Sequence, residues 1–198
     1  MSKSGSEVSK KARNKTVRWV VTIFLVTIVI SGIISFISAE VMQHSSILAA
    51  FLILLTIIMV GIIFDIIGMA VASADEKPFH SMAARKVTGA QAAILLLRNA
   101  ERVSTICNDV IGDICGVVSG CASATIAVQI LQNFEFNWPQ MITLSMSAIC
   151  AGLTVGGKAI GKSFAVNSAT TIVHTVGKFI YWFQHIPELF RSKKKNKR

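Results

Sequence analysis

Four long apolar blocks constrain this chain more than any other feature. They run approximately over residues 17–38, 46–72, 103–131 and 141–157, and the third and fourth also carry small and polar residues. A helix crosses a bilayer with roughly 20 apolar residues, so each block is long enough to span a membrane. A mean hydropathy of +0.61 with 15% charged residues is too apolar for an ordinary soluble domain. The sequence therefore predicts an all-α polytopic membrane protein with four transmembrane helices.

The first block could instead belong to a signal peptide. However, the basic region before it covers residues 1–18, and the apolar run exceeds the usual length of about 7 to 15 residues. The following sequence, SFISAEV, also offers no good small-x-small cleavage site. We therefore expect the first block to be retained as a transmembrane helix.

The basic residues predict the orientation of the spans. All 20 Lys and Arg precede the first block, lie between the second and third, or follow the fourth; the loops 39–45 and 132–140 have none. By the positive-inside rule, both termini are cytoplasmic, as in a multi-pass protein of the cell (inner) membrane. Topology and contacts with anionic lipids account for the net charge of +10, so no nucleic-acid partner is expected.

Four further segments are expected on the cytoplasmic side. Residues 1–16 predict a disordered basic tail, and residues 186–198 predict a polybasic tail. The segment between the second and third blocks predicts a cytoplasmic helical hairpin with a break at Gly89. Residues 158–183 are too polar to span, and their apolar residues recur at helical spacing. They predict one or two juxtamembrane amphipathic helices, either in contact with lipid or packed under the bundle.

Two aspartates in the third block raise the question of function. On an α-helix, Asp109 and Asp113 share a face with Gly116 and Gly120, and glycine at four-residue intervals lets another helix approach closely. We therefore expect the two carboxylates to face protein rather than lipid. A buried carboxylate needs a bound cation, a basic side chain or a proton.

The sequence offers three possible partners for these aspartates. Lys158, at the inner end of the fourth block, could neutralise one of them. A divalent cation could be held by both together with Asp65 of the second block, because hard cations prefer oxygen ligands. Alternatively, both aspartates lie near the cytoplasmic end and face water or Arg102. No nucleophile–base cluster, phosphate loop or zinc signature occurs, so we do not expect an enzyme.

The order of four motifs resembles the transmembrane domain of the cyclin-M/CorC family of magnesium transporters. FDIIGMAVAS (64–73) stands in the place of the family motif Phe-Ser-x-Ser-Glu-x-Ala, and KVTGAQAAILLLRNAER (86–102) resembles the family hairpin. TICNDVIGDI (105–114) stands in the place of the family's helix start Thr-Ile…Gly-Asn-Thr-Leu-x-Asn. GKAIGKSFA (157–165) stands in the place of the family motif Gly-Glu-x-x-Pro-Lys. The resemblance covers roughly residues 50–185.

The resemblance implies a site for Mg²⁺ as the bound or transported ion. By position, its ligands map to Asp65 or Ile67, to Asp109 and Asp113, and to the carbonyl of Gly157. Gly68 and Lys158 replace the family's two motif glutamates. Either the site is rebuilt around Asp65, Asp109 and Asp113, or Lys158 fills the cation position.

The resemblance also implies the organisation of the chain. Residues 46–185 would form a cyclin-M/CorC-like domain, preceded by an extra transmembrane helix at 17–38 and assembled as a homodimer. The cystathionine-β-synthase pair that usually follows is expected to be missing, because the sequence ends at Arg198. The function predicted first is divalent metal cation transport, most simply of Mg²⁺. The alternative is a non-transporting membrane scaffold or accessory subunit with the same fold.

Overall fold

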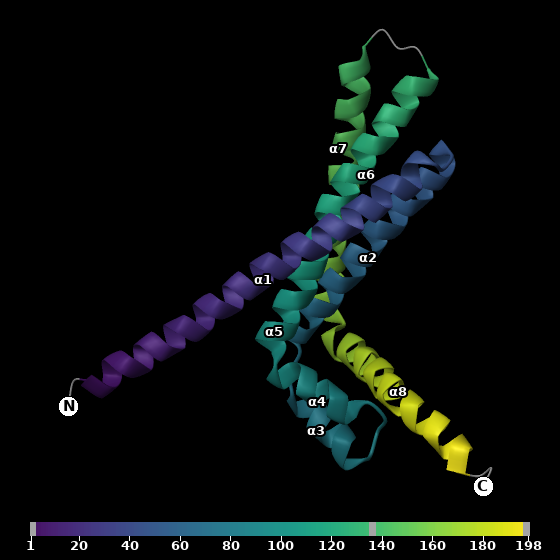
Figure 1. Cartoon of the computed structure of the whole chain (residues 1–198). Helices are drawn as coiled ribbons and strands as arrows, with labels where there is room; N and C mark the ends of the chain where they lie inside the picture. Colours follow the sequence, from purple (N-terminus) through teal and green to yellow (C-terminus); the bar gives the residue numbers. More distant parts are fainter. Residues whose placement is uncertain (1–2, 135–137, 196–198) are drawn as a thin grey trace. The chain divides into compact units, whose positions relative to one another are not determined.

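The computed structural model describes residues 3–134 and 138–195, with side chains described for 17–134 and 138–183, and every regular element within these ranges is a helix. The elements in chain order are α1 (Lys3–Gln43), α2 (Ile47–Ser73), α3 (Lys77–Ala84), α4 (Ala90–Arg98), α5 (Ala100–Thr105), the π-helix η1 (Ile106–Gly112), α6 (Asp113–Asn133), α7 (Pro139–Asn167) and α8 (Ala169–Lys195) (Figure 1).

Four helical segments are long and apolar enough to cross a membrane: Val17–Gln43, Ile47–Ser73, Ala100–Asn133 and Pro139–Asn167. They match the four apolar blocks of the sequence, and they indicate a membrane-embedded protein. Pro139 opens α7, as its missing N–H allows at the first helical position. The orientation of the spans stays a prediction.

Two boundaries differ from the sequence prediction. The fourth span was expected to end near residue 157, but α7 continues as one helix to Asn167, and α8 starts only at Ala169. The N-terminal tail differs as well: α1 begins at Lys3, so helix covers most residues predicted as a disordered tail, and α8 extends to Lys195, into the predicted polybasic tail. Propagating an existing helix costs less than starting one, which favours such extension. Residues 1–2 and 196–198 lie outside the described residues.

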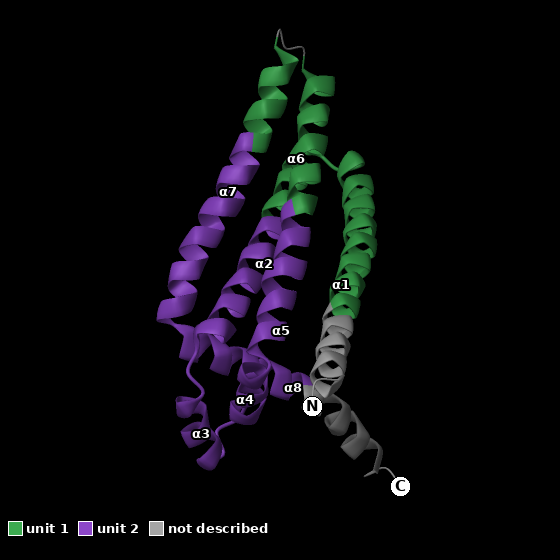
Figure 2. Ribbon diagram, turned by 90° about the vertical axis from the view of Figure 1, so that its left-hand side faces the viewer, with its two compact units in different colours: residues 1–55, 117–147 green, residues 56–116, 148–198 purple. Residues whose placement is uncertain are grey.

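The chain forms two compact units, and α2, α6 and α7 each contribute to both (Figure 2). The first unit comprises Met1–Leu55 and Val117–Ser147. Its buried residues include Met42 at the end of α1 and Ile126 on α6. Gln129 on α6 is also buried and donates a side-chain hydrogen bond to the carbonyl of Met42, which ties α6 to α1.

The second unit comprises Thr56–Gly116 and Ala148–Arg198, and it contains the predicted site residues. Its core is a cluster of small and aliphatic residues around the fully buried Phe79 of α3: Ala70, Val71, Ala93, Ala165, Ala169 and Val173. Helix α4 packs against α3 on one side and α8 on the other (Figure 1). The break predicted at Gly89 is confirmed, since this residue precedes α4 with a φ of 85°, which glycine adopts readily.

Candidate functional site

Glycines bring α2, α6 and α7 into close contact within the second unit. A Cβ atom on Gly61 of α2 would lie 2.8 Å from the Cβ of Cys115 on α6. A Cβ atom on Gly161 of α7 would lie 2.8 Å from Cγ1 of Ile66 on α2. Small residues at helix interfaces let backbones approach closely, and these glycines leave no room for a side chain. Helices α2, α6 and α7 therefore lie close together around the residues between the Gly61 and Gly161 contacts.

Lys158 is the centre of a charged cluster at this meeting point. Its Nζ lies 3.6 Å from Oδ1 of Asp65 on α2 and 3.7 Å from Oδ1 of Asp113 at the start of α6. It also donates a 3.3 Å hydrogen bond to the carbonyl oxygen of Gly112. An ammonium group has three protons to donate, and here three oxygens, from α2, η1 and α6, surround it.

The two aspartates of the cluster have different environments. The side chain of Asp65 is only 6% exposed and that of Lys158 is 20% exposed, so this is a largely buried ion pair. The side chain of Asp113 is 69% exposed, and exposed pairs contribute little to stability. Asp65 is therefore the carboxylate that depends on Lys158, because a buried charge without a partner is strongly unfavourable.

Gly112 makes the cluster sterically possible. This residue is buried, and a Cβ atom on it would lie 3.1 Å from Oδ1 of Asp65 and 3.4 Å from Nζ of Lys158. Any side chain would press on both charged groups. The absence of one lets Lys158 reach the Gly112 carbonyl as well as the carboxylates.

The expectation that Asp109 and Asp113 both face protein is not met in the described chain. Asp109 is exposed, and no described residue lies within 4 Å of a Cβ atom placed on Gly116 or Gly120. The close helix contacts use other glycines, among them Gly61 and Gly161. A side chain at Gly116 or Gly120 would thus meet no neighbouring helix among the described residues.

The π-helix η1 explains why Asp109 does not join the cluster. A π-helix uses i→i+5 instead of i→i+4 hydrogen bonds, so it contains more residues per turn than an α-helix and shifts the register of its residues. Sequence spacing assumed an α-helix throughout this segment. In the structure, Asn108 instead of Asp109 lies against α2, where its side chain contacts Gly68. Single-turn π segments occur frequently at functional sites.

Asn108 is a site residue that the sequence argument missed. Its Nδ2 donates a 3.3 Å hydrogen bond to Oγ of Ser104, while its Oδ1 is buried and has no hydrogen-bond partner among the described residues. Oδ2 of Asp65 is likewise buried and unpartnered. The sequence signal that could have identified this residue is the asparagine itself, which lies one position before Asp109, the residue that the resemblance implied as a ligand.

The residues predicted as metal ligands are only partly brought together. Lys158 links Asp65 and Asp113, whereas Asp109 is exposed and Gly157 packs against Ile62 of α2. Among the residues whose side chains the structure describes, 17–134 and 138–183, no group of three or more His, Cys, Asp or Glu is arranged to hold a metal ion. The predicted charge partner Lys158 does contact the aspartates, while the alternative of Arg102 finds no described ion pair with them.

Comparisons with protein-family models, curated proteins and solved structures find no match to this chain. The class is therefore defined by fold and site alone: a helical protein with four potential membrane spans and a buried Asp–Lys pair that joins α2 and α7.

Proposed function

We propose that the chain is a non-transporting membrane protein, a scaffold or accessory subunit of cyclin-M/CorC-like fold, in which Lys158 fills the cation position. The observation that supports this is the buried Asp65–Lys158 pair, with Nζ 3.6 Å from Oδ1. The ammonium group supplies the positive charge that a buried carboxylate requires. In this proposal the pair fixes the packing of α2 against α7, and no ion needs to enter.

The proposal follows from competition for the same oxygens. A divalent cation at Asp65 would have to displace Lys158, which already contacts Asp65, Asp113 and the Gly112 carbonyl. Two cations could not share Oδ1 of Asp65 in a partly dehydrated site without strong repulsion. The position of the Lys158 ammonium group stays favourable as long as Asp65, Asp113 and the Gly112 carbonyl stay in place.

The second candidate function is transport of a divalent cation, with Mg²⁺ as the first ion to test. It is favoured by two buried oxygens without hydrogen-bond partners, Oδ2 of Asp65 and Oδ1 of Asn108. Carboxylate and amide oxygens are ligands that hard cations prefer. In this mechanism Lys158 would leave the site when the ion enters, and Asp109 and Asp113 would attract the ion from outside.

Flux into proteoliposomes distinguishes the two functions. The purified chain is reconstituted with a Mg²⁺-sensitive dye inside the vesicles, beside protein-free vesicles and the variant Asp65→Asn. We expect wild type and variant to show the same influx as protein-free vesicles. Influx through the wild type that Asp65→Asn abolishes would establish the transporter instead.

We also propose that a second copy of the chain covers the open face of α6, forming a homodimer. This face carries the exposed Asp113 together with Gly116 and Gly120, beside which there is free space for another helix. A carboxylate facing lipid is costly, and small residues favour helix–helix contact. Disulfide crosslinking of Gly120→Cys in a cysteine-free background tests this; crosslinked dimer is expected, and monomer only would argue against it.

A further inference from the structure

Helix α8 has an apolar face that is already packed inside the second unit. Val173 is fully buried, and Gly177 lies against α4, where a Cβ atom on it would come within 2.6 Å of the Gly89 carbonyl oxygen and 3.1 Å of Cβ of Ala93. This face is therefore already covered by α4 and the core cluster.

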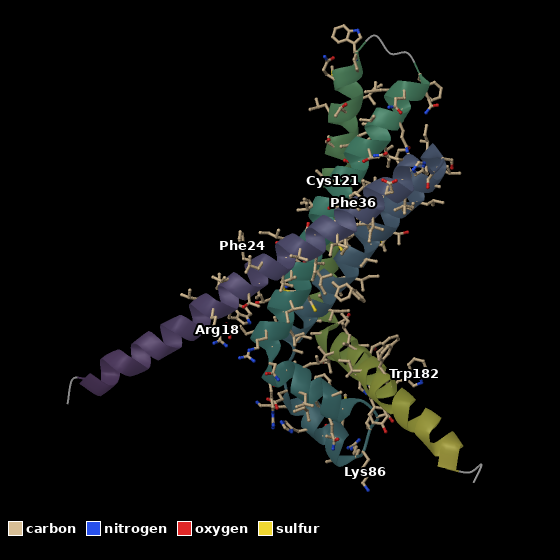
Figure 3. All side chains as sticks on the ribbon, in the orientation of Figure 1. Arg18, Phe24, Phe36, Lys86, Cys121 and Trp182 are labelled. Carbon is tan, nitrogen blue, oxygen red and sulfur yellow. The ribbon has the colours of Figure 1, made fainter. Side chains whose placement is uncertain are left out.

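A second apolar face on the same helix has no such partner among the residues whose side chains the structure describes. Phe179, Trp182 and Phe183 are 66%, 58% and 66% exposed, and the rings of Phe179 and Trp182 lie 6.3 Å apart. At about 100° per residue, Trp182 is about 180° around the helix from Val173. Figure 3 shows Trp182 projecting from the side of α8 that is turned away from α4. We call Phe179, Trp182 and Phe183 the aromatic face.

The charge of α8 indicates what covers the aromatic face. Lys178 is exposed beside it. From Ala169 to Lys195 the helix carries five basic residues and the single acidic residue Glu188; the basic ones are Lys178, Arg191, Lys193, Lys194 and Lys195. A second copy of α8 docking here would bring like charges together, whereas an anionic surface would attract them.

Helix α8 follows directly on a potential membrane span. Helix α7 is a potential membrane span that ends at Asn167, and only Ser168 separates it from α8. The start of α8 therefore lies where a span leaves the bilayer. Exposed tryptophan and phenylalanine with flanking lysines are the composition of helices that lie in the headgroup layer.

We propose that the aromatic face of α8 inserts into the headgroup layer of the membrane and that its basic residues bind anionic lipids there. The helix would then be held between α4 on one side and lipid on the other. Because it concerns a surface separate from the Asp65–Lys158 pair, this proposal stands whether or not the chain transports ions.

Tryptophan fluorescence tests the proposal with the full chain in liposomes. The chain has three tryptophans, so Trp19→Phe and Trp138→Phe leave Trp182 as the only reporter. The vesicles contain brominated phosphatidylcholine, with or without phosphatidylglycerol, and acrylamide is the aqueous quencher. We expect bromine to quench Trp182, more strongly with phosphatidylglycerol, and acrylamide to have little effect.

Charge variants isolate the contribution of anionic lipid. Lys178→Gln in the single-tryptophan background is expected to lower quenching in phosphatidylglycerol vesicles, and the matched variant Lys86→Gln, in the turn between α3 and α4, to leave it unchanged. Efficient acrylamide quenching without bromine quenching would overturn the proposal. Equal bromine quenching in both vesicle types would overturn the anionic-lipid part. Protection from both quenchers would overturn the whole proposal, because it would indicate that a protein partner covers the aromatic face.

Discussion

Replacing Lys158 by Met should destabilise the protein because it leaves Asp65 buried without its partner. Breaking a buried ion pair by removing one partner costs about 3–5 kcal/mol. Lys158 is 20% exposed and Asp65 only 6%, so we expect a value near the lower end, about 3 kcal/mol. Unfolding by sodium dodecyl sulfate in mixed micelles, followed by circular dichroism, measures this loss. Lys162→Met on the same helix is the matched control, because Lys162 is exposed.

A double-mutant cycle shows whether this loss belongs to the pair. With Asp65→Asn and Lys158→Met combined, no buried charge is left unpaired, so the double variant should lose less stability than the sum of the single ones by about 2 kcal/mol. The exposed Asp113 predicts a loss below about 1 kcal/mol for Asp113→Asn. Additive losses, or a Lys158→Met variant as stable as Lys162→Met, would refute the argument for a structural ion pair.

Three further substitutions and one control test the packing of the helices by the same unfolding assay. Gly61→Ala should cost about 1–3 kcal/mol by overpacking, since its Cβ would lie 2.8 Å from a neighbouring Cβ; the control Gly152→Ala, which has free space, should cost nothing. Gly89→Ala should cost more than about 1 kcal/mol, because φ is 85° there, and a neutral result would rule out this turn. Gln129→Leu removes the side-chain hydrogen bond to the Met42 carbonyl, which keeps its bond from the Ser45 N–H, and should cost about 0.5–1.5 kcal/mol; no change would show that the Gln129 bond is not stabilising.

The regular parts of the fold could be predicted because hydrophobicity and helix-boundary residues act locally. Each apolar block long enough for a bilayer forms a helix, Pro139 begins α7, and Gly89 takes a conformation that suits glycine. The fourth helix was predicted to end near residue 157 because the residues that follow are too polar to span a membrane. In the structure Gly157 serves packing against Ile62, and α7 continues through it.

The site depended on features that sequence spacing does not contain. The sequence predicted Lys158 as a possible partner of the aspartates. It did not predict that the buried partner of Lys158 would be Asp65. Asn108 lies where Asp109 was expected because η1 is a π-helix. A π-helix of seven residues leaves no simple periodic signal in the sequence. Which glycines meet another helix depends on tertiary contacts, and these use Gly61 instead of Gly116.

The most direct test of the central claim is the Mg²⁺ dependence of thermal stability for the wild type and Lys158→Ala. A ligand that binds only the folded state raises its stability as concentration rises. If Lys158 fills the cation position, the wild type should show no saturable Mg²⁺-specific shift. Lys158→Ala frees Asp65, Asp113 and the Gly112 carbonyl, and should acquire one. A saturable shift in the wild type that Asp65→Asn abolishes would contradict the claim and establish a metal site beside Lys158.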